Sequence, residues 1–233
     1  MRETKAVILD FDGTIGDTRG LIVCTMQQTI AALGLDSRSD DECAAMIGLP
    51  LRDTFTKLIP MDEAMGDRCV EVYTELFFKN NSRMRVPLFP HVTETIKRLH
   101  AGGLLLTIAS SRQRASLLMF LRDMQLERYI TYIVSASDVE QAKPAPDMVK
   151  RTLADNGLAS DQAIVVGDTV YDIQMAHNAG VAAIGVTYGN GTRGELLDAG
   201  AEYIIDDFAE VADIVLNKKG RGAAVRRSDG TAL

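Results

Sequence analysis

Four short polar segments of the sequence carry side chains that could do chemistry together. The first holds Asp10 and Asp12, the second Ser110, the third Lys143 and the fourth Asp168. Carboxylates held close together repel one another, and a hard cation relieves that repulsion. Mg²⁺ prefers one or two protein carboxylates and takes its other ligands from water and substrate phosphate, which fits Asp10 and Asp168. Lys143 and the Ser110 hydroxyl would supply a positive charge and a hydrogen-bond donor for phosphate oxygens. The set therefore indicates phosphoryl transfer.

These segments follow, or lie between, short apolar runs that have the pattern of buried β-strands. Continuous apolar runs that alternate with helical stretches are typical of a parallel sheet covered on both faces. Ligands of such sheets bind beyond the carboxyl ends of the strands, where the polar segments would converge. The sequence therefore predicts an α/β fold with a doubly wound parallel sheet. Its strands are expected over residues 6–9, 104–109, 130–134, 163–166 and 181–186.

The long segment between the first two predicted strands has a helical pattern and no convincing strand. Gly34, Gly48 and Pro60 interrupt it. We therefore predict an inserted all-α cap domain over residues 16–85, joined near Gly16 and Pro87 to an α/β core domain made of residues 1–15 and 86–216. Residues 217–233 lack apolar periodicity, which is typical of a flexible tail. The cap helices are expected over residues 21–33, 40–47, 51–59 and 61–79.

Composition limits the function classes. The chain has 233 residues, enough for a core plus an insert, and 25 Lys and Arg against 32 Asp and Glu give a net charge of −7. This balance repels nucleic acid and anionic membranes, so neither is expected as a partner. The three cysteines form no CxxC pair, which disfavours a disulfide framework or a zinc site. No apolar run has the length of a membrane span and no targeting segment is evident, so the expected location is the cytoplasm.

In order and spacing, the polar segments resemble the four motifs of the haloacid dehalogenase superfamily. The matching residues are Asp10 to Thr14, Ser110, Lys143, and Gly167 to Asp172. Each motif is short, but together, at their expected strand ends and with a helical insert after the first, they span nearly the whole chain. Residues 48–51 (Gly-Leu-Pro-Leu) and 186–189 (Val-Thr-Tyr-Gly) are similar to the phosphoglycolate phosphatase-like subgroup, whose cap is α-helical.

The resemblance implies a Mg²⁺-dependent phosphatase that works through an aspartyl phosphate. Asp10 would attack phosphorus, and Asp12 would protonate the leaving oxygen and then activate water. Mg²⁺ would be held by Asp10, the main-chain carbonyl of Asp12, and Asp168. Asp172 would hold water or Lys143, while Thr14 and Ser110 would steady Asp12 and the phosphoryl group. The substrate implied is a small phosphorylated metabolite such as phosphoglycolate.

Further residues near the motifs are candidates for contact with the substrate. Arginine pairs bidentately with carboxylate or phosphate. Arg52, beside the loop at residues 48–50, and Arg112, beside Ser110, are therefore expected to bind the organic part of the substrate. Ser111 and Gly167 complete the candidate set, because they stand at the ends of the second and fourth predicted strands.

Other functions remain open at this level. Asp12 argues against carbon–halogen cleavage, because the dehalogenases of the superfamily lack an acid two residues after the nucleophile. Mutases of the β-phosphoglucomutase type share all four motifs, but commonly carry a His where this chain has residues 18–22 (Thr-Arg-Gly-Leu-Ile). A sugar-phosphate mutase and a non-catalytic phosphate-binding module stay as alternatives. The GxGxxG pattern at residues 189–194 is interpreted as coincidental, since too little chain follows to complete a dinucleotide-binding unit.

Overall fold

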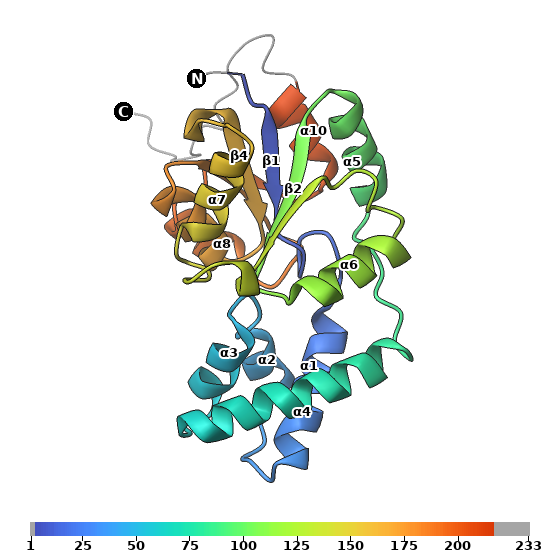
Figure 1. The fold of residues 1–233 in the computed structure, drawn as a ribbon, viewed down its shortest axis with the longest axis vertical. Coiled ribbons are helices and arrows are strands. Elements are labelled where there is room, and N and C mark those ends of the chain that lie inside the picture. The colour runs from blue at the N-terminus through green and yellow to red at the C-terminus, as the bar shows by residue number, and fades with distance from the viewer. Residues whose placement is uncertain (1–2, 217–233) are drawn as a thin grey trace, which may run out of the picture.

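The computed structural model describes residues 3–216. Six parallel strands form one sheet in the order β3-β2-β1-β4-β5-β6, which confirms the predicted α/β fold (Figure 1). The predicted runs correspond to the first five strands, and the last strand is an addition. The strands are β1 (Ala6–Leu9), β2 (Leu105–Ser110), β3 (Tyr132–Ser135), β4 (Ala163–Gly167), β5 (Ala182–Val186) and β6 (Tyr203–Ile205).

Helices cover both faces of the sheet because the central strands are apolar on both sides. Val7 and Leu9 of β1 pack into one apolar cluster with α5 (Val92–Ala101), α6 (Arg114–Asp123) and α10 (Ala209–Leu216). Ala6 and Ile8, which point the other way, pack with α7 (Asp147–Asp155), α8 (Val170–Asn178) and α9 (Arg193–Asp198). Two short 3-10 helices, η1 (Ala136–Asp138) and η2 (Ser160–Gln162), precede α7 and β4.

The register of the sheet aligns the ends of its three central strands. Leu9 at the end of β1 pairs with Ile108 of β2 and with Val166 of β4. The next residue, Asp10, continues the pairing, because its N–H donates to the Val166 carbonyl over 2.8 Å. Residues that follow β1, β2 and β4 therefore meet at one edge of the sheet.

Four helices lie beyond this edge, between β1 and β2 in the sequence (Figure 1). They are α1 (Arg19–Ala32), α2 (Asp40–Ala44), α3 (Leu51–Leu58) and α4 (Glu63–Asn81). Local signals start two of them. The Ser39 side chain forms a capping box with Glu42, and the Asp62 carboxylate accepts a hydrogen bond from the Met65 N–H. The helices match the predicted ones; their treatment as a separate cap domain over residues 16–85 stays our interpretation.

The two segments that connect these helices to the sheet run side by side. The Asp17 N–H donates to the Pro87 carbonyl over 2.9 Å, and the Phe89 N–H donates to the Ile15 carbonyl over 3.1 Å. Gly16 and Leu88 form an antiparallel bridge between them. Within residues 3–216 no helix combines the length and hydrophobicity needed to cross a membrane. The predicted flexible tail, residues 217–233, lies outside the described part of the chain.

Candidate active site

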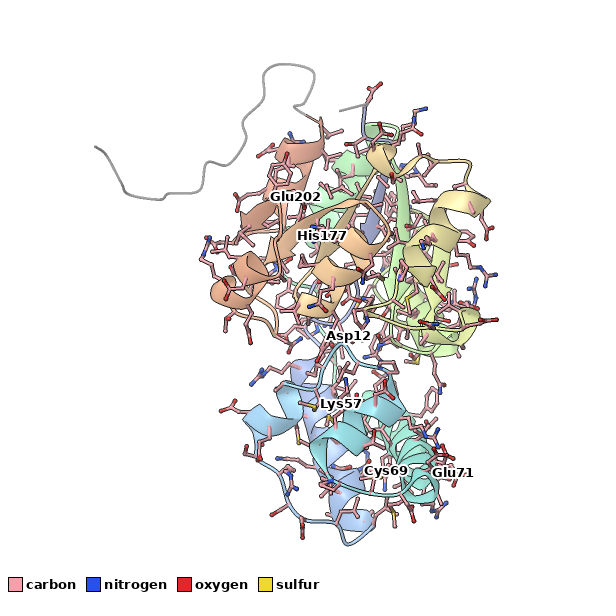
Figure 2. All side chains as sticks on the ribbon, turned by 90° about the vertical axis from the view of Figure 1, so that its left-hand side faces the viewer. Asp12, Lys57, Cys69, Glu71, His177 and Glu202 are labelled. Carbon is pink, nitrogen blue, oxygen red and sulfur yellow. The ribbon has the colours of Figure 1, made fainter. Side chains whose placement is uncertain are left out.

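The loop after β1 carries two carboxylates, and Figure 2 shows one of them, Asp12, where the sheet and the four helices meet. Asp10 and Asp12 flank Phe11, whose side chain is fully buried. The Phe11 carbonyl accepts hydrogen bonds from the N–H groups of Ile15 and Gly16, at 3.0 and 2.9 Å, which closes a tight turn. Gly13 has φ +86°, and a Cβ there would lie 2.0 Å from an oxygen of Asp168. This turn needs glycine for its backbone conformation and for the close approach of Asp168.

Lys143 joins two of the buried carboxylates. Its Nζ donates to Asp10 Oδ1 over 2.5 Å and to Asp172 Oδ1 over 2.6 Å, and all three side chains are almost completely buried. Burial lowers the pKa of Lys143, but the two carboxylates outweigh it and hold that pKa above its usual range. Asp172 also accepts from the N–H and hydroxyl of Thr169 and so caps α8. The contact of Asp172 with Lys143 is the one that the resemblance implies.

Asp168 follows β4 and is held by two loops that are distant in sequence. Its Oδ1 accepts from the Thr14 hydroxyl over 3.2 Å, and its Oδ2 accepts from the Asn190 backbone N–H over 2.7 Å and from the Asn190 side-chain amide over 2.9 Å. Thr14 is predicted to steady Asp12, and this prediction is wrong because the structure gives that contact to Thr18, whose hydroxyl donates to Asp12 over 2.6 Å.

The glycines beside Asn190 let its loop approach Asp168. A Cβ on Gly189 would lie 2.4 Å from the Asp168 side chain. Two of the three glycines in the GxGxxG pattern at residues 189–194, Gly189 and Gly191, are thus explained by the close approach to Asp168. Neither Asn190 nor Thr18 was among the predicted site residues, because a single polar residue beside glycines or at a helix start has no distinctive sequence pattern.

Asp12 is paired with Arg112. The guanidinium donates through Nε to Asp12 Oδ2 over 3.0 Å and through Nη2 to Oδ1 over 2.5 Å. It lies 4.9 Å from the ring centre of Phe77 on α4 and 5.0 Å from that of Phe120 on α6. Burial lowers the pKa of Arg112, whereas Asp12 raises it, and the net shift is upward. Arg112 therefore contacts Asp12 in this structure, beside the place where the substrate is expected.

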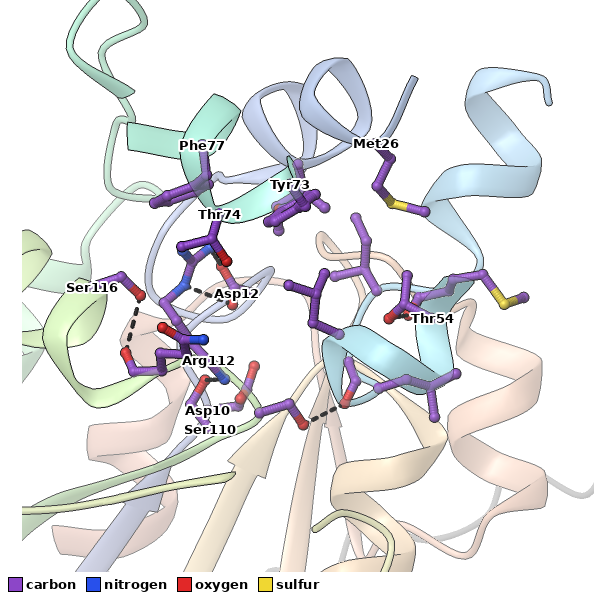
Figure 3. Close-up of a pocket in the computed structure, with 18 of the residues that line it drawn as sticks. Asp10, Asp12, Met26, Thr54, Tyr73, Thr74, Phe77, Ser110, Arg112 and Ser116 are labelled. Carbon is purple, nitrogen blue, oxygen red and sulfur yellow. Dashed lines mark hydrogen bonds and ion pairs between the residues drawn. The ribbon is translucent and has the colours of Figure 1, made fainter. Parts of the chain in front are cut away.

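Ser110 is the last residue of β2 and Ser111 follows it; Figure 3 shows Ser110 close to Asp10. Ser110 is buried, lines a cavity together with Asp10, and accepts a hydrogen bond from the Arg112 N–H over 3.3 Å. The Ser111 hydroxyl donates to the Gly48 carbonyl over 2.6 Å and so connects the sheet to the helical insert. Gly167 ends β4, where a Cβ would lie 2.3 Å from Asp172. Arg52 is not brought to this place: its side chain is 41% exposed and pairs with Asp67.

The carboxylates are suited to hold a divalent metal ion. Oxygens of Asp10, Asp168 and Asp172 lie within 4.8 Å of one another. Burial, together with Asp172, raises the pKa of Asp168 to about 7, and burial also raises the pKa of Asp10 well above its ordinary value. Four carboxylates, counting Asp12, face only the two cations Lys143 and Arg112 in these contacts, so negative charge is in excess. Hard oxygen donors with excess negative charge fit Mg²⁺.

A cavity of about 110 Å³ opens above these groups (Figure 3). Asp10, Asp12 and Ser110 line it from the sheet side, and Tyr73 and Phe77 line it from α4. Asp10 therefore connects the buried cluster of carboxylates and Lys143 to one small cavity, which Asp12 also lines.

Comparison with known proteins gives a consistent result. Residues 7–186 match the family described as haloacid dehalogenase-like hydrolase. A protein of Dickeya dadantii named Probable phosphatase IndB is 32% identical over 88% of this chain and 90% of its own. Pyrophosphatase PpaX of Oceanobacillus iheyensis is 29% identical over 91% of this chain and 96% of its own. The phosphoglycolate phosphatase of Agrobacterium fabrum is 28% identical over 93% of this chain and 96% of its own.

The same fold occurs in solved structures of other proteins. The crystal structure of a predicted phosphatase from Clostridium acetobutylicum superposes with a TM-score of 0.85 at 24% identity, over 93% of this chain and all of that one. At this identity the likeness concerns the fold alone.

Proposed function

The chain belongs to the haloacid dehalogenase-like hydrolase family and is a phosphatase, and from this premise we propose that it hydrolyses a small phosphorylated metabolite through a phosphoaspartate on Asp10, with Mg²⁺. The observation that carries the proposal is that Asp10 lines the cavity beside Asp12, while Lys143 pairs with Asp10 and Asp168 has an oxygen within 4.8 Å of it. Nucleophile, positive charge, metal-binding oxygens and acid are the parts that phosphoryl transfer needs.

The first half-reaction transfers the phosphoryl group to the protein. An oxygen of the ionised Asp10 carboxylate forms a bond to phosphorus while the bond from phosphorus to the ester oxygen breaks. Lys143 favours the ionised form of Asp10, because its ammonium donates directly to that carboxylate. Asp12 gives a proton to the departing oxygen, which leaves as an alcohol.

The second half-reaction restores the enzyme. Asp12, now ionised, takes a proton from water as the water oxygen attacks phosphorus, and the bond between phosphorus and Asp10 breaks. The products are inorganic phosphate and the free Asp10 carboxylate. The Ser110 hydroxyl lines the cavity and would donate to a phosphoryl oxygen.

Three residues would hold the metal ion. These are Asp10, Asp168 and, through its main-chain carbonyl, Asp12; the Asp12 carboxylate, which Arg112 and Thr18 hold in place, would not bind the metal ion. Bound there, Mg²⁺ would offset the charge shared by the nucleophile and the incoming phosphate. Asn190 and Thr14 orient Asp168 for this task.

The test is phosphate release from a panel of small phosphate esters, with p-nitrophenyl phosphate, phosphoglycolate and pyrophosphate included, in Mg²⁺ and again in chelator. We expect release that depends on Mg²⁺, and its loss in Asp10→Asn at an unchanged melting temperature. Asp17→Asn, which alters a nearby exposed carboxylate, is the matched control and should keep wild-type activity.

Intact-protein mass spectrometry should show a phosphorylated species during turnover in the wild type and in Asp12→Asn, where slow hydrolysis should make it accumulate. Asp10→Asn should show none. An Asp10→Asn variant with wild-type turnover would refute the covalent mechanism. Transfer of the phosphoryl group to a second hydroxyl of a sugar phosphate would identify the mutase, and phosphate binding with no turnover of any ester would identify a binding module.

A further inference from the structure

The side of the cavity that faces the phosphoryl-transfer groups is uncharged. Among the described residues between 16 and 85, every one that lines the cavity is apolar or neutral. Ile22 and Met26 come from α1, Met46 and Ile47 from the loop before α3, and Tyr73 from α4. The organic group of an ester whose phosphorus faces Asp10 would project toward this wall, because the wall lies across the cavity from Asp10 (Figure 3).

Three cations that are near this wall in the sequence have their contacts elsewhere. Arg19 pairs with Asp41 over 3.0 Å, and Arg52 pairs with Asp67. Lys57 lies where the two parts of the molecule meet (Figure 2), with its ammonium 5.9 Å from the ring centre of Tyr171. None of the three lines the cavity.

The threonine hydroxyls of the wall are directed into their own helices. Thr54 donates to the Pro50 carbonyl over 3.2 Å, and Thr74 donates to the Val70 carbonyl over 2.7 Å. These donors are used within the protein. A ligand with several hydroxyl groups would therefore gain little from them.

Arg112 is the cation that lines the cavity within the described residues, and its guanidinium already pairs with Asp12. Two of its nitrogens donate to Asp12, and the rings of Phe77 and Phe120 lie close to its guanidinium. A carboxylate on the substrate would have to share Arg112 with Asp12, whose negative charge would repel it and which the proposed mechanism needs in that position. A carboxylate that found no partner would be buried without compensation, which is strongly unfavourable.

Resting on the proposed function, we propose that this enzyme prefers phosphate monoesters of small uncharged alcohols, whose apolar group fills the cavity, over esters that carry a carboxylate, a second phosphate or several hydroxyls. A protein cavity of about 150 Å³ holds a benzene molecule, so a cavity of about 110 Å³ suits a short branched or unsaturated chain.

The decisive comparison is between isobutyl phosphate and phosphoglycolate. Their organic groups have the same number of non-hydrogen atoms and the same branching, and they differ in charge. We expect kcat/KM for isobutyl phosphate to exceed that for phosphoglycolate by at least about tenfold, and to exceed those for pyrophosphate and glucose 6-phosphate likewise. A ratio of one or less would overturn the inference. Turnover of p-nitrophenyl phosphate, measured alongside, keeps the two proposals apart: if it is hydrolysed the proposed function stands whatever the ratio, and if no ester is hydrolysed both fail.

A charge introduced into the wall should reverse the preference. Met46→Lys keeps an unbranched side chain and adds an ammonium at the cavity; Ala32→Lys adds the same charge at an exposed position in the last turn of α1. We expect the ratio of isobutyl phosphate to phosphoglycolate to fall at least about tenfold in Met46→Lys and to change less than about twofold in Ala32→Lys. The intrinsic reactivity of each ester cancels in this comparison. An unchanged ratio in Met46→Lys, at a melting temperature equal to that of the control, would show that this wall does not select the substrate.

Discussion

Arg112 holds the proposed acid through two hydrogen bonds, so its planar shape matters as much as its charge. Lysine would keep the charge but could not make the paired contacts with Asp12. We expect Arg112→Lys to lower kcat about tenfold or more, and to slow release of phosphate from the phosphoenzyme, because Asp12 loses its orientation. Single-turnover kinetics with mass detection of the phosphoenzyme would check this. Arg114→Lys, at a half-exposed arginine that pairs with Asp138, is the control, and an equal effect in both variants would contradict the assignment.

Asn190 orients the carboxylate proposed to bind the metal ion. Asn190→Ala removes the side-chain hydrogen bond to Asp168 and leaves the backbone one. Residues of this kind typically change metal affinity by about 10- to 100-fold. We therefore expect the Mg²⁺ concentration for half-maximal activity to rise by such a factor, with little change in kcat at saturating Mg²⁺. Asn156→Ala, which removes a hydrogen bond to Thr152 in α7, should leave it unchanged.

The four motifs were visible in the sequence because each polar group follows a buried apolar run, and the chemistry of those side chains is rarely combined by chance. The sequence could not show which donor would reach which carboxylate. Thr14 and Thr18 are both close to Asp12 in the chain, and only the turn around Phe11 decides that Thr18 contacts it. Asn190 reaches Asp168 because β5 lies beside β4, a long-range pairing that no local pattern encodes.

At the scale of elements, the turn from β3 into η1 is fixed by one carboxylate. Asp138 accepts from the Ser135 N–H and hydroxyl, at 2.8 and 2.6 Å, and from Arg114 on α6 at 3.1 Å. The segment it anchors leads toward Lys143. Burial raises the pKa of Asp138, but the hydrogen bonds from Ser135 and Arg114 lower it more, so the net shift is downward.

A lowered pKa in the folded state makes the stabilisation by Asp138 dependent on pH. The contribution is complete above the ordinary carboxyl pKa, about 3.9, and is lost as the pH falls through the lower folded value. We expect Asp138→Asn to reduce the free energy of unfolding by about 1 kcal/mol at pH 7, and the difference from wild type to shrink in that acid range. Urea unfolding at several pH values measures it, with Asp123→Asn as the exposed control. A difference that did not depend on pH would contradict the role of the charge.

The elements themselves were largely predictable. Glycine and proline separate the helices of the insert, and the first five strands are continuous apolar runs. β6 was not predicted because it has three residues, Tyr203–Ile205, at the edge of the sheet, where only one side pairs with another strand. Such a short run is too weak a signal on its own.

For the whole molecule, the excess of buried negative charge implies that the fold is strained without a cation. Binding of a ligand at 100 times its Kd adds about 2.7 kcal/mol, and about 2 to 4 °C per kcal/mol is usual for a chain of this length. We expect saturating Mg²⁺ to raise the melting temperature by about 5 to 10 °C. Asp168→Asn should melt no lower than wild type in chelator and should lose the response to Mg²⁺. A wild-type melting temperature insensitive to Mg²⁺ would argue against a metal site at these carboxylates.

The hydrogen-bonded pairing of the two segments at Ile15–Asp17 and Pro87–Phe89 has a consequence for how such enzymes diversify. The chain leaves the sheet and returns to it at neighbouring points. The paired segments therefore join the inserted helices to the sheet at a single place. An insert of different length could be joined at the same two segments without disturbing the strands that position the reactive residues. An exchanged insert would still have to supply the contacts that Thr18 and Phe77 make with Asp12 and Arg112.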